Sequence, residues 1–346
     1  MRLPASDAAE AAVDDPMLKT VEAAPEQWAR ALAIARAADV PRVRPRSVVV
    51  AGMGGSGVAG DVAALVASEH ADLPVLAVHG EVLPAYVGPE DLVVLVSHSG
   101  GTEETLACAE QARRSGARLV AVTSGGELGQ RVAQAGGTVI EVTSDAPPRA
   151  SMALLTVPVL GVLERVGGLV GALDACSEIP GLLEPLVSRW SPDAAAEPEP
   201  ARLARALGAR QPVFLGVDRI SSVVATRARN QVAENAERPA VAAELPEADH
   251  NQLVGWAGAG TGGSCDLVLL RPAEELERTR RRVAATVDLV RDGFAEVHEH
   301  RLAPDGVIGQ IASGFLFVDL LSVHLALLAG IDPTPIRAIE ELKRRL

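Results

Sequence analysis

Short apolar segments that alternate with helical segments constrain the fold of this chain more than any other feature. The segment RSVVVAG (46–52) is rich in β-branched residues and ends in glycine, which is typical of a buried strand. GVAGDVAALVASEHA (57–71) follows with the composition of a helix. Because parallel strands need such crossover helices, a repeated alternation predicts a doubly wound α/β fold with mostly parallel sheets flanked by helices.

The alternation recurs in both halves of the chain. Further strands are predicted at 73–80, 91–100, 117–126, 137–144, 212–217, 265–272 and 295–302. Further helices are predicted over 102–117, 127–136, 221–237, 274–293 and 308–330, with a loop between 237 and 265. The shared order of strands and helices predicts two similar α/β domains in tandem.

A length of 346 residues also suggests two domains. A change of composition at WSPDAAAEPEPA (190–201), rich in proline, alanine and acidic residues, is typical of a linker. We therefore expect four segments. They are an N-terminal helical segment (1–45), a first domain (46–189), a linker (190–207) and a second domain (208–346).

Two long apolar segments, 152–173 and 310–331, contain charged residues such as Glu164 and Asp319. They are interpreted as buried helices and not as membrane spans. The N-terminus has no apolar stretch typical of a secretory signal. The three cysteines lack metal or disulfide spacing. A reduced, cytoplasmic protein without a membrane partner is therefore expected.

Charge and composition narrow the range of partners. The formal net charge is −13, so a nucleic-acid backbone would be repelled on average. Aromatic residues make up only 2% of the chain, which also disfavours stacking of unpaired bases. A small anion is still compatible with this charge, because backbone amides and one or two cations can reverse the local field.

The first candidate site is Gly52-Met53-Gly54-Gly55-Ser56-Gly57, after a strand and at the start of a helix. Glycines there let an anion approach the free N–H groups of the helix. The motif also fits the GxGxxG dinucleotide fingerprint, with Glu81 as an imperfect ribose acid. A nicotinamide-dependent dehydrogenase and a simple tight turn are the alternatives.

The second candidate site is Ser97-His98-Ser99-Gly100-Gly101-Thr102, again between a strand and a helix. Three hydroxyl groups and glycine amides at a helix N-terminus suit a phosphate dianion. An ordinary N-cap is the alternative, but a cap needs one hydroxyl group and not three. The motif therefore favours phosphate binding.

Several stretches together resemble the sugar isomerase (SIS) family of phosphosugar-binding domains, and more closely its bifunctional phosphoglucose/phosphomannose isomerases. The stretches are GMGGSGVAGD (52–61), SHSGGTEET (97–105), PPRAS (147–151), NQVAENAERPAVAAELPEADHNQ (230–252) and IDPTPIRAIEELKRRL (331–346). The resemblance implies two tandem SIS domains, with phosphate bound in the first and catalytic groups drawn largely from the second.

The resemblance also assigns roles. Glu234 is similar to the catalytic base, His250 to the ring-opening acid/base, Arg149 to the group that stabilises the enediolate, and Lys343 to the lysine beside the sugar ring. The implied phosphate and substrate contacts are Gly54, Gly55, Ser56, Ser97, Ser99 and Thr102. It implies a hexose phosphate substrate, no metal or other cofactor, and a homodimer with shared active sites.

Each catalytic candidate has a structural alternative. Glu234 shares its helix with charges such as Arg227 and would be a surface ion-pair residue. His250 would be exposed in a polar loop, and Arg149 an exposed cap. Lys343 would serve the dipole of a C-terminal helix, although it is one of only two lysines in the chain.

Three positions depart from the family pattern: His98 replaces an aromatic residue, Gly101 an asparagine and Gln252 an acid. These changes bear on sugar preference more than on reaction type. The expected activity is interconversion of glucose 6-phosphate or mannose 6-phosphate with fructose 6-phosphate through a cis-enediolate. A phosphosugar sensor without turnover is the alternative, although the chain lacks the basic DNA-binding segment such regulators carry.

The remaining histidines are not expected to bind a metal. His298 and His300 share one face of a predicted strand, but no third ligand is evident in the sequence, so a solvated strand edge is favoured. His324, in an apolar helix, is expected to be a core histidine with its hydrogen bonds satisfied.

Overall fold

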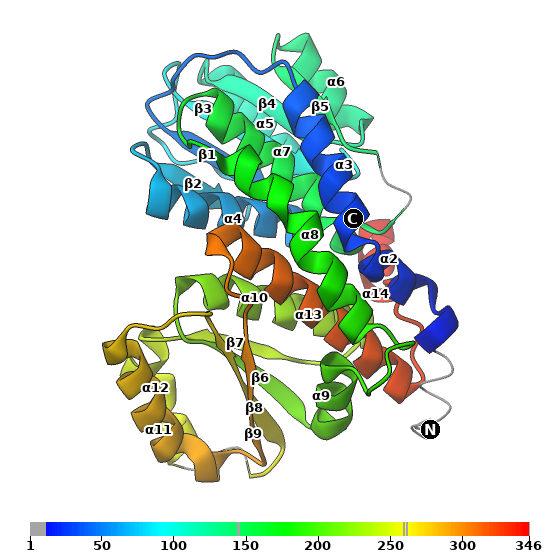
Figure 1. Cartoon of the computed structure of the whole chain (residues 1–346). Coiled ribbons are helices and arrows are strands. Elements are labelled where there is room, and N and C mark those ends of the chain that lie inside the picture. Colours follow the sequence, from blue (N-terminus) through cyan, green and yellow to red (C-terminus); the bar gives the residue numbers. More distant parts are fainter. Residues whose placement is uncertain (1–11, 144–145, 259, 261, 346) are drawn as a thin grey trace. The chain divides into compact units, whose positions relative to one another are not determined.

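The computed structural model describes residues 12–143, 146–258, 260 and 262–345. The chain forms two compact units (Figure 1). One contains residues 24–181, and the other combines the described residues up to Ala23 with Leu182 onwards. Each unit has a parallel sheet with helices on its faces, which confirms the predicted fold class. The domain boundaries drawn from composition stay predictions.

In the unit of residues 24–181 the sheet has the order β2-β1-β3-β4-β5. Its strands are β1 (Val48–Gly52), β2 (Val75–Val78), β3 (Leu92–Ser97), β4 (Arg118–Thr123) and β5 (Thr138–Glu141). The direction in which strands are added reverses between β1 and β3. In open parallel sheets ligands bind beyond the carboxyl ends of the strands at such a reversal. Both glycine-rich motifs follow the two strands that meet there.

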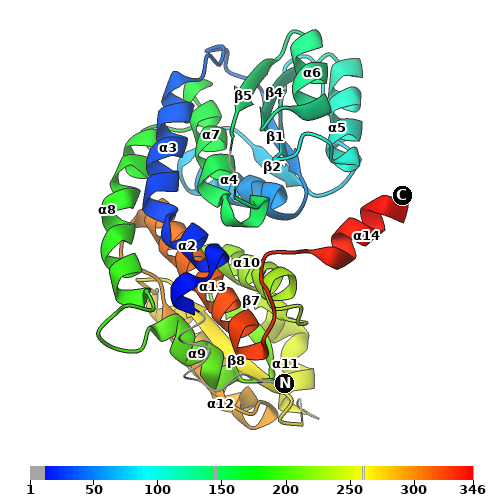
Figure 2. The ribbon, with the colours of Figure 1, turned by 90° about the vertical axis from the view of Figure 1, so that its right-hand side faces the viewer.

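The helices of this unit lie on both faces of the sheet (Figure 2). They are α3 (Ala24–Ala37), α4 (Gly54–His70), α5 (Glu103–Arg114), α6 (Gly126–Gln134), η1 (Pro148–Ala150) and α7 (Met152–Arg165). On one face, Leu106 of α5 and Leu128 of α6 pack with Val93 and Leu95 of β3 in a buried apolar core. On the other face α4 and α7 pack together, and α3 packs on α7. α8 (Ala172–Trp190) crosses the division between the units.

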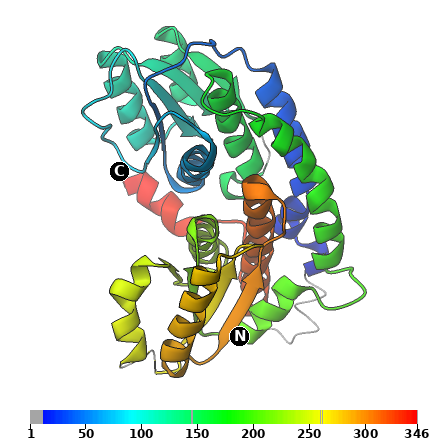
Figure 3. The same ribbon diagram turned by 60° about the vertical axis from the view of Figure 1, so that its left-hand side comes forward.

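The other unit has a four-stranded sheet of order β7-β6-β8-β9. Its strands are β6 (Gln211–Gly216), β7 (Val241–Glu244), β8 (Cys265–Arg271) and β9 (Val297–Arg301). Its helices are α2 (Pro16–Glu22), α9 (Glu199–Leu207), α10 (Arg219–Asn235), η2 (Glu247–His250), α11 (Gln252–Ala257), α12 (Glu277–Val290), η3 (Arg291–Gly293), α13 (Gly306–Ala329) and α14 (Arg337–Arg345). Trp256 of α11 and Val283 of α12 pack on one face of this sheet, and α10 lies on the other (Figure 3).

Several elements lie where the sequence predicts none, among them β7, η2 and α11 in the expected loop. β7 lies within the expected loop. Composition did not predict it, because its Val-Ala-Ala-Glu segment has no run of β-branched residues and forms a strand by pairing with β6. α9 lies within the expected linker, with Leu203, Ala204 and Leu207 buried. Among the described residues of segment 1–45, 12–14, α2 and α3 are helical and 38–45 are not.

The helix prediction is confirmed for one of the two long apolar segments and is wrong in part for the other. The single helix predicted over 152–173 is wrong beyond Arg165, because a turn with Gly167 and Gly171 at positive φ separates α7 from α8. The second segment is confirmed as a buried helix, α13. It is long and apolar enough to cross a membrane, yet 94% of its most apolar window is buried inside the protein. This burial is that of a core helix.

His324 on α13 is buried, but its Nε2 atom has no hydrogen-bond partner among the described residues. The expectation of a satisfied core histidine is therefore wrong for that atom. The side chain borders a cavity of about 270 Å³ together with Leu327 and Pro198. Removal from water lowers the pKa of His324 from 6.5 to about 4. The imidazole is neutral in the folded protein at neutral pH.

This burial predicts a specific loss of stability in acid. The unfolded chain takes up a proton at His324 below about pH 6.5, whereas the folded protein does so only near pH 4. The free energy of unfolding should therefore fall by about 3 kcal/mol as pH drops through that window. Urea unfolding between pH 4 and 7 should show a weaker pH dependence in His324→Leu. The exposed His70 offers a control, since His70→Gln should keep the wild-type profile. An unchanged profile in His324→Leu would contradict the burial argument.

Candidate active site

The loop between β1 and α4 offers uncapped backbone N–H groups. α4 begins at Gly54, two residues after β1 ends, and Met53 at its N-cap is extended. Met53 makes no side-chain cap bond. Helix N-termini attract anions through their free N–H groups and dipole. The N–H groups of Gly54, Gly55 and Ser56 are therefore placed to bind an anion, as expected for the first motif.

Gly57 is glycine because a histidine ring occupies the space beside it. A Cβ atom at position 57 would lie 2.4 Å from Nδ1 of His79, which follows β2. The same ring has its Nε2 2.8 Å from Oδ1 of Asp61 on α4. Sequence interpretation did not assign His79 and Asp61 to the site. The available signal was the position of His79 directly after a strand of the same parallel sheet.

The loop between β3 and α5 directs its hydroxyl groups toward one another. Ser97 Oγ and Thr102 Oγ1 are 2.9 Å apart. The Gly100 N–H donates to Ser97 Oγ at 3.2 Å, and the Gly101 N–H donates to Ser99 Oγ at 3.3 Å. Thr102 occupies the N-cap of α5 but makes no side-chain cap bond. The hydroxyl groups therefore do not serve as an ordinary cap, and that alternative is wrong.

A third turn, after β4, braces this loop. The Ser124 N–H donates to the His98 carbonyl at 3.0 Å, and the Leu128 N–H donates to the Gly100 carbonyl at 2.8 Å. Gly100 has a φ of +67°, and a Cβ atom there would lie 2.1 Å from the Gly125 carbonyl oxygen. Sequence interpretation did not include this turn, although Val-Thr-Ser-Gly-Gly (122–126), at the end of β4, has the same glycine and hydroxyl character.

His98 adds no fixed positive charge to the loop. Burial lowers the pKa of this histidine below its ordinary value of 6.5. Its Nε2 is buried and has no hydrogen-bond partner among the described residues. The candidate groups for binding an anion in this unit are therefore backbone N–H groups, hydroxyl groups and an arginine.

Arg149 lies in η1, immediately before α7, and is only 5% exposed. Its Cα would be 3.8 Å from a Cβ atom built on Gly55, so its backbone lies against the β1–α4 loop. The alternative of an exposed cap is wrong. The fold thus brings Arg149 beside the first glycine-rich loop, although about 95 residues separate them in sequence.

Glu234, His250 and Lys343 belong to the other unit. Glu234 lies half-buried near the end of α10. His250 is exposed at the end of η2, which follows the edge strand β7. Asp249 anchors that turn by accepting hydrogen bonds from Arg282 Nη1 at 2.9 Å and Thr286 Oγ1 at 2.8 Å. Lys343 is exposed in the last turn of α14, a helix with no buried residue.

The charged residues around Glu234 are not all on the surface. Arg227, grouped with Glu234 as a surface charge in the sequence interpretation, is 2% exposed. It forms a bidentate pair with Asp319 on α13, with Nε–Oδ1 at 2.8 Å and Nη2–Oδ2 at 2.5 Å. That assignment of Arg227 is therefore wrong. The Arg238 Nη1 donates to the Gly208 carbonyl at 2.8 Å.

His298 and His300 lie on the edge strand β9, but packing buries the His300 side chain and most of the His298 side chain. His300 is 4% exposed, stacks on Phe317 of α13 and has its Nδ1 2.9 Å from Glu199 Oε1 on α9. The His298 side chain is 12% exposed. The expectation of solvent exposure is therefore wrong for both.

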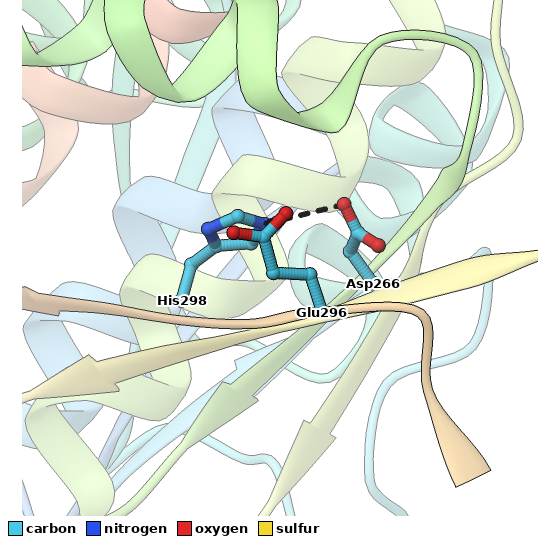
Figure 4. A group of neighbouring side chains, drawn as sticks. All are labelled: Asp266, Glu296 and His298. Carbon is cyan, nitrogen blue, oxygen red and sulfur yellow. Dashed lines mark hydrogen bonds and ion pairs between the residues drawn. The ribbon is translucent and has the colours of Figure 1, made fainter. Parts of the chain in front are cut away.

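His298 joins a group of charges at the amino ends of β8 and β9 (Figure 4). Ligand atoms of Asp266, Glu296 and His298 lie within 4.8 Å of one another, a spacing that suits a metal ion. Arg210, however, donates to Asp266 Oδ1 at 2.6 Å and to Glu296 Oε2 at 3.3 Å. The His298 Nε2 is 3.2 Å from Asp266 Oδ2. The arginine already pairs with both carboxylates, so ion pairing accounts for the group.

Two family models match the chain. The SIS domain model matches residues 43–144, and a model described as the bacterial phospho-glucose isomerase C-terminal SIS domain matches residues 196–346. A bifunctional phosphoglucose/phosphomannose isomerase of Caldicellulosiruptor bescii is 30% identical over 334 residues, which is 95% of this chain and 98% of the relative. An enzyme of the same name from Aquifex aeolicus is 30% identical over 310 residues, 87% of this chain and 90% of that protein.

Solved structures agree on the fold. The C-terminal domain of glucosamine-fructose-6-phosphate aminotransferase from Francisella tularensis superposes with a TM-score of 0.73, covering 93% of this chain and 98% of that one. Its sequence identity is 14%, so this likeness concerns architecture alone. The full-length sequence match is the decisive comparison. The chain belongs to the bifunctional phosphoglucose/phosphomannose isomerase family, and both of its halves match SIS domain models.

Proposed function

We propose that this protein is an aldose–ketose isomerase that interconverts glucose 6-phosphate, mannose 6-phosphate or both with fructose 6-phosphate. The observation that carries the proposal is the match over 95% of the chain to a relative of that name. The geometry of the unit of residues 24–181 agrees with it. The neighbouring strands β1 and β3 end beside uncapped N–H groups and hydroxyl groups, which suit an anion.

In this proposal the phosphate binds at the carboxyl ends of β1 and β3. Its contacts are the N–H groups of Gly54 and Gly55 and the side chains of Ser56, Ser97, Ser99 and Thr102. Charge-assisted hydrogen bonds from these groups would hold the dianion without a lysine in the loop. The phosphate then acts as an anchor that fixes the position of the sugar carbons.

Glu234 transfers the proton in this proposal. Its carboxylate removes the proton from C2 of the open-chain aldose while the carbonyl oxygen at C1 gains negative charge. The cis-enediolate that results takes the proton back at C1 while the hydroxyl proton on O2 passes to O1, which yields the ketose with its carbonyl at C2 and restores the carboxylate. The Arg149 guanidinium stabilises the charge on the enediolate oxygen. Since glucose and mannose phosphates differ only at C2, both give the same enediolate.

Ring opening precedes the proton transfer and needs an acid/base pair. His250 suits this step because an imidazole titrates near neutral pH, and Lys343 provides a compact cationic donor beside the ring oxygen. Both side chains are exposed in the unit that carries them. We further propose a cytoplasmic homodimer in which His250 enters the active site of the partner subunit. Analytical ultracentrifugation of the purified protein measures the dimer.

The proposed activity is tested with fructose 6-phosphate in heavy water, with a chelator present. We expect glucose 6-phosphate or mannose 6-phosphate to form, with solvent deuterium at C2, because the proton passes through a carboxyl group that exchanges with solvent. Proton NMR follows product and deuterium together. Absence of both aldose product and deuterium exchange would overturn the isomerase proposal. Tight binding of fructose 6-phosphate under the same conditions would then favour a sensor.

A further inference from the structure

A line of polar side chains joins α10, which carries Glu234, to the core helix α13. Arg227, Gln231 and Asn235 are spaced four residues apart, so they form one stripe along α10. All three are buried. They meet Asp319 and Ser322, which lie three residues apart on one face of α13. The contact between these helices therefore includes a line of polar groups.

The ion pair at one end of this line is fully enclosed. Arg227 and Asp319 side chains are 2% and 11% exposed, and both guanidinium–carboxylate contacts are within hydrogen-bond distance. The Gln231 side chain also hydrogen-bonds to Asp319. The guanidinium lies 4.8 Å from the ring centre of Phe315, one turn earlier on α13. A planar guanidinium held by two parallel bonds permits little rotation or sliding.

The other end of the line lies next to the proposed base. The Asn235 Nδ2 donates to Ser322 Oγ at 2.8 Å, and the Ser322 hydroxyl donates to the Asp319 carbonyl at 2.7 Å. Asn235 is the residue after Glu234, so this bond holds the turn of α10 from which the carboxylate projects. Glu234 itself borders the buried stripe and is half-buried.

We propose that Arg227, Asp319, Asn235 and Ser322 are positioning residues that set the rotation and register of α10, and thereby the place of the Glu234 carboxylate. This inference rests on the proposed function, because it gives Glu234 the role of base. Apolar contacts would hold the helices together equally well, but they are not directional. Buried polar pairs tend to lower the free energy of unfolding. In this proposal their contribution is to fix the orientation of α10.

The test replaces the ion pair by apolar residues of similar size in the double variant Arg227→Met/Asp319→Leu. Removing both partners leaves no unpaired buried charge, so the variant should melt at or above the wild-type temperature. Without the directional pair, α10 can turn, and a displacement of about 1 Å at a reacting group lowers turnover by about 10–100-fold. We expect kcat to fall by that factor with KM within about threefold of wild type.

A second arginine–aspartate pair in the same unit, with a buried aspartate and a partly exposed arginine, supplies the control. Arg210 and Asp266 lie at the amino ends of the strands, the opposite edge of the sheet from the loop that carries His250. The double variant Arg210→Met/Asp266→Leu should keep wild-type kcat. Ser322→Ala is a milder change that removes only the bond from Asn235, and it should lower kcat by about threefold to tenfold with unchanged KM.

The outcomes separate the inference from the proposed function. A folded Arg227→Met/Asp319→Leu protein with wild-type kcat overturns the positioning role. If that double variant fails to fold, the kcat of Ser322→Ala decides, and a wild-type value overturns the role. If the wild-type protein itself has no isomerase activity, the proposed function has failed. Crystal structures of the wild type and Ser322→Ala then decide, and an unmoved Glu234 overturns the inference.

Discussion

Glu234→Gln is expected to bind fructose 6-phosphate with wild-type affinity and to lose turnover by about 10²–10⁴-fold. Glutamine has nearly the shape of glutamate, so the contacts of α10 with its neighbours should survive the change. The amide cannot accept the proton from C2 at neutral pH, because it has no basic oxygen of comparable pKa. Steady-state kinetics measures the loss of kcat, and isothermal titration calorimetry measures the dissociation constant for fructose 6-phosphate.

A matched control lies three residues further along the chain. Glu237 is exposed just beyond the end of α10, so Glu237→Gln changes the same net charge without touching the proposed base. It should retain wild-type kcat. Deuterium exchange into substrate should also stop in Glu234→Gln, since that exchange reports proton removal alone. Turnover close to wild type in Glu234→Gln would exclude this carboxylate as the base.

Gly100→Ala is expected to weaken phosphate binding strongly while the adjacent Gly101→Ala leaves it intact. At position 100 the backbone has a φ of +67°, and a Cβ atom would lie 2.1 Å from the carbonyl oxygen of Gly125. Both facts oppose any side chain, and the obstructing atom belongs to the backbone. The loop of Ser97–Thr102 or the turn after β4 must move, and the hydrogen bonds that arrange the hydroxyl groups move with it.

We expect Gly100→Ala to weaken fructose 6-phosphate binding by at least about tenfold and to lower the free energy of unfolding by about 1–3 kcal/mol. A Cβ atom at Gly101 would meet no heavy atom of the described residues within 4 Å beyond its chain neighbours, and the φ of Gly101 is not in the left-handed range. Calorimetry with fructose 6-phosphate and urea unfolding compare the two variants. Wild-type affinity in Gly100→Ala would show that the phosphate binds elsewhere.

Most of the strands and helices follow from short stretches of sequence. β1, β3 and β4 are runs of Val, Leu and Ala buried on both faces of a parallel sheet, and such strands have a recognisable local composition. β7 has no such composition, and it is a strand because the neighbouring β6 offers its free edge. α9 begins at Glu199 with prolines on both sides, so composition alone suggested a linker.

In the candidate site, too, some features follow from local sequence and others depend on the fold. Its two anion-binding loops could be predicted, because a strand, a glycine-rich turn and a helix N-terminus occupy about ten consecutive residues each. The bracing turn after β4 and the packing of His79 beside Gly57 could not, since they depend on how neighbouring strands align in the sheet. Arg149 required the fold to show that it is buried beside the first loop.

The sequence by itself determined that this chain forms two parallel α/β sheets and that the first carries two glycine-rich turns, each between a strand and a helix. Tertiary structure alone decided which charges are buried and with whom. Arg227 pairs with a residue 92 positions away, and His300 with one 101 positions away. The physical reason is that hydrophobic periodicity and turn-forming residues are local features of a few consecutive residues. The partner of a buried charge, in contrast, depends on how distant segments pack together.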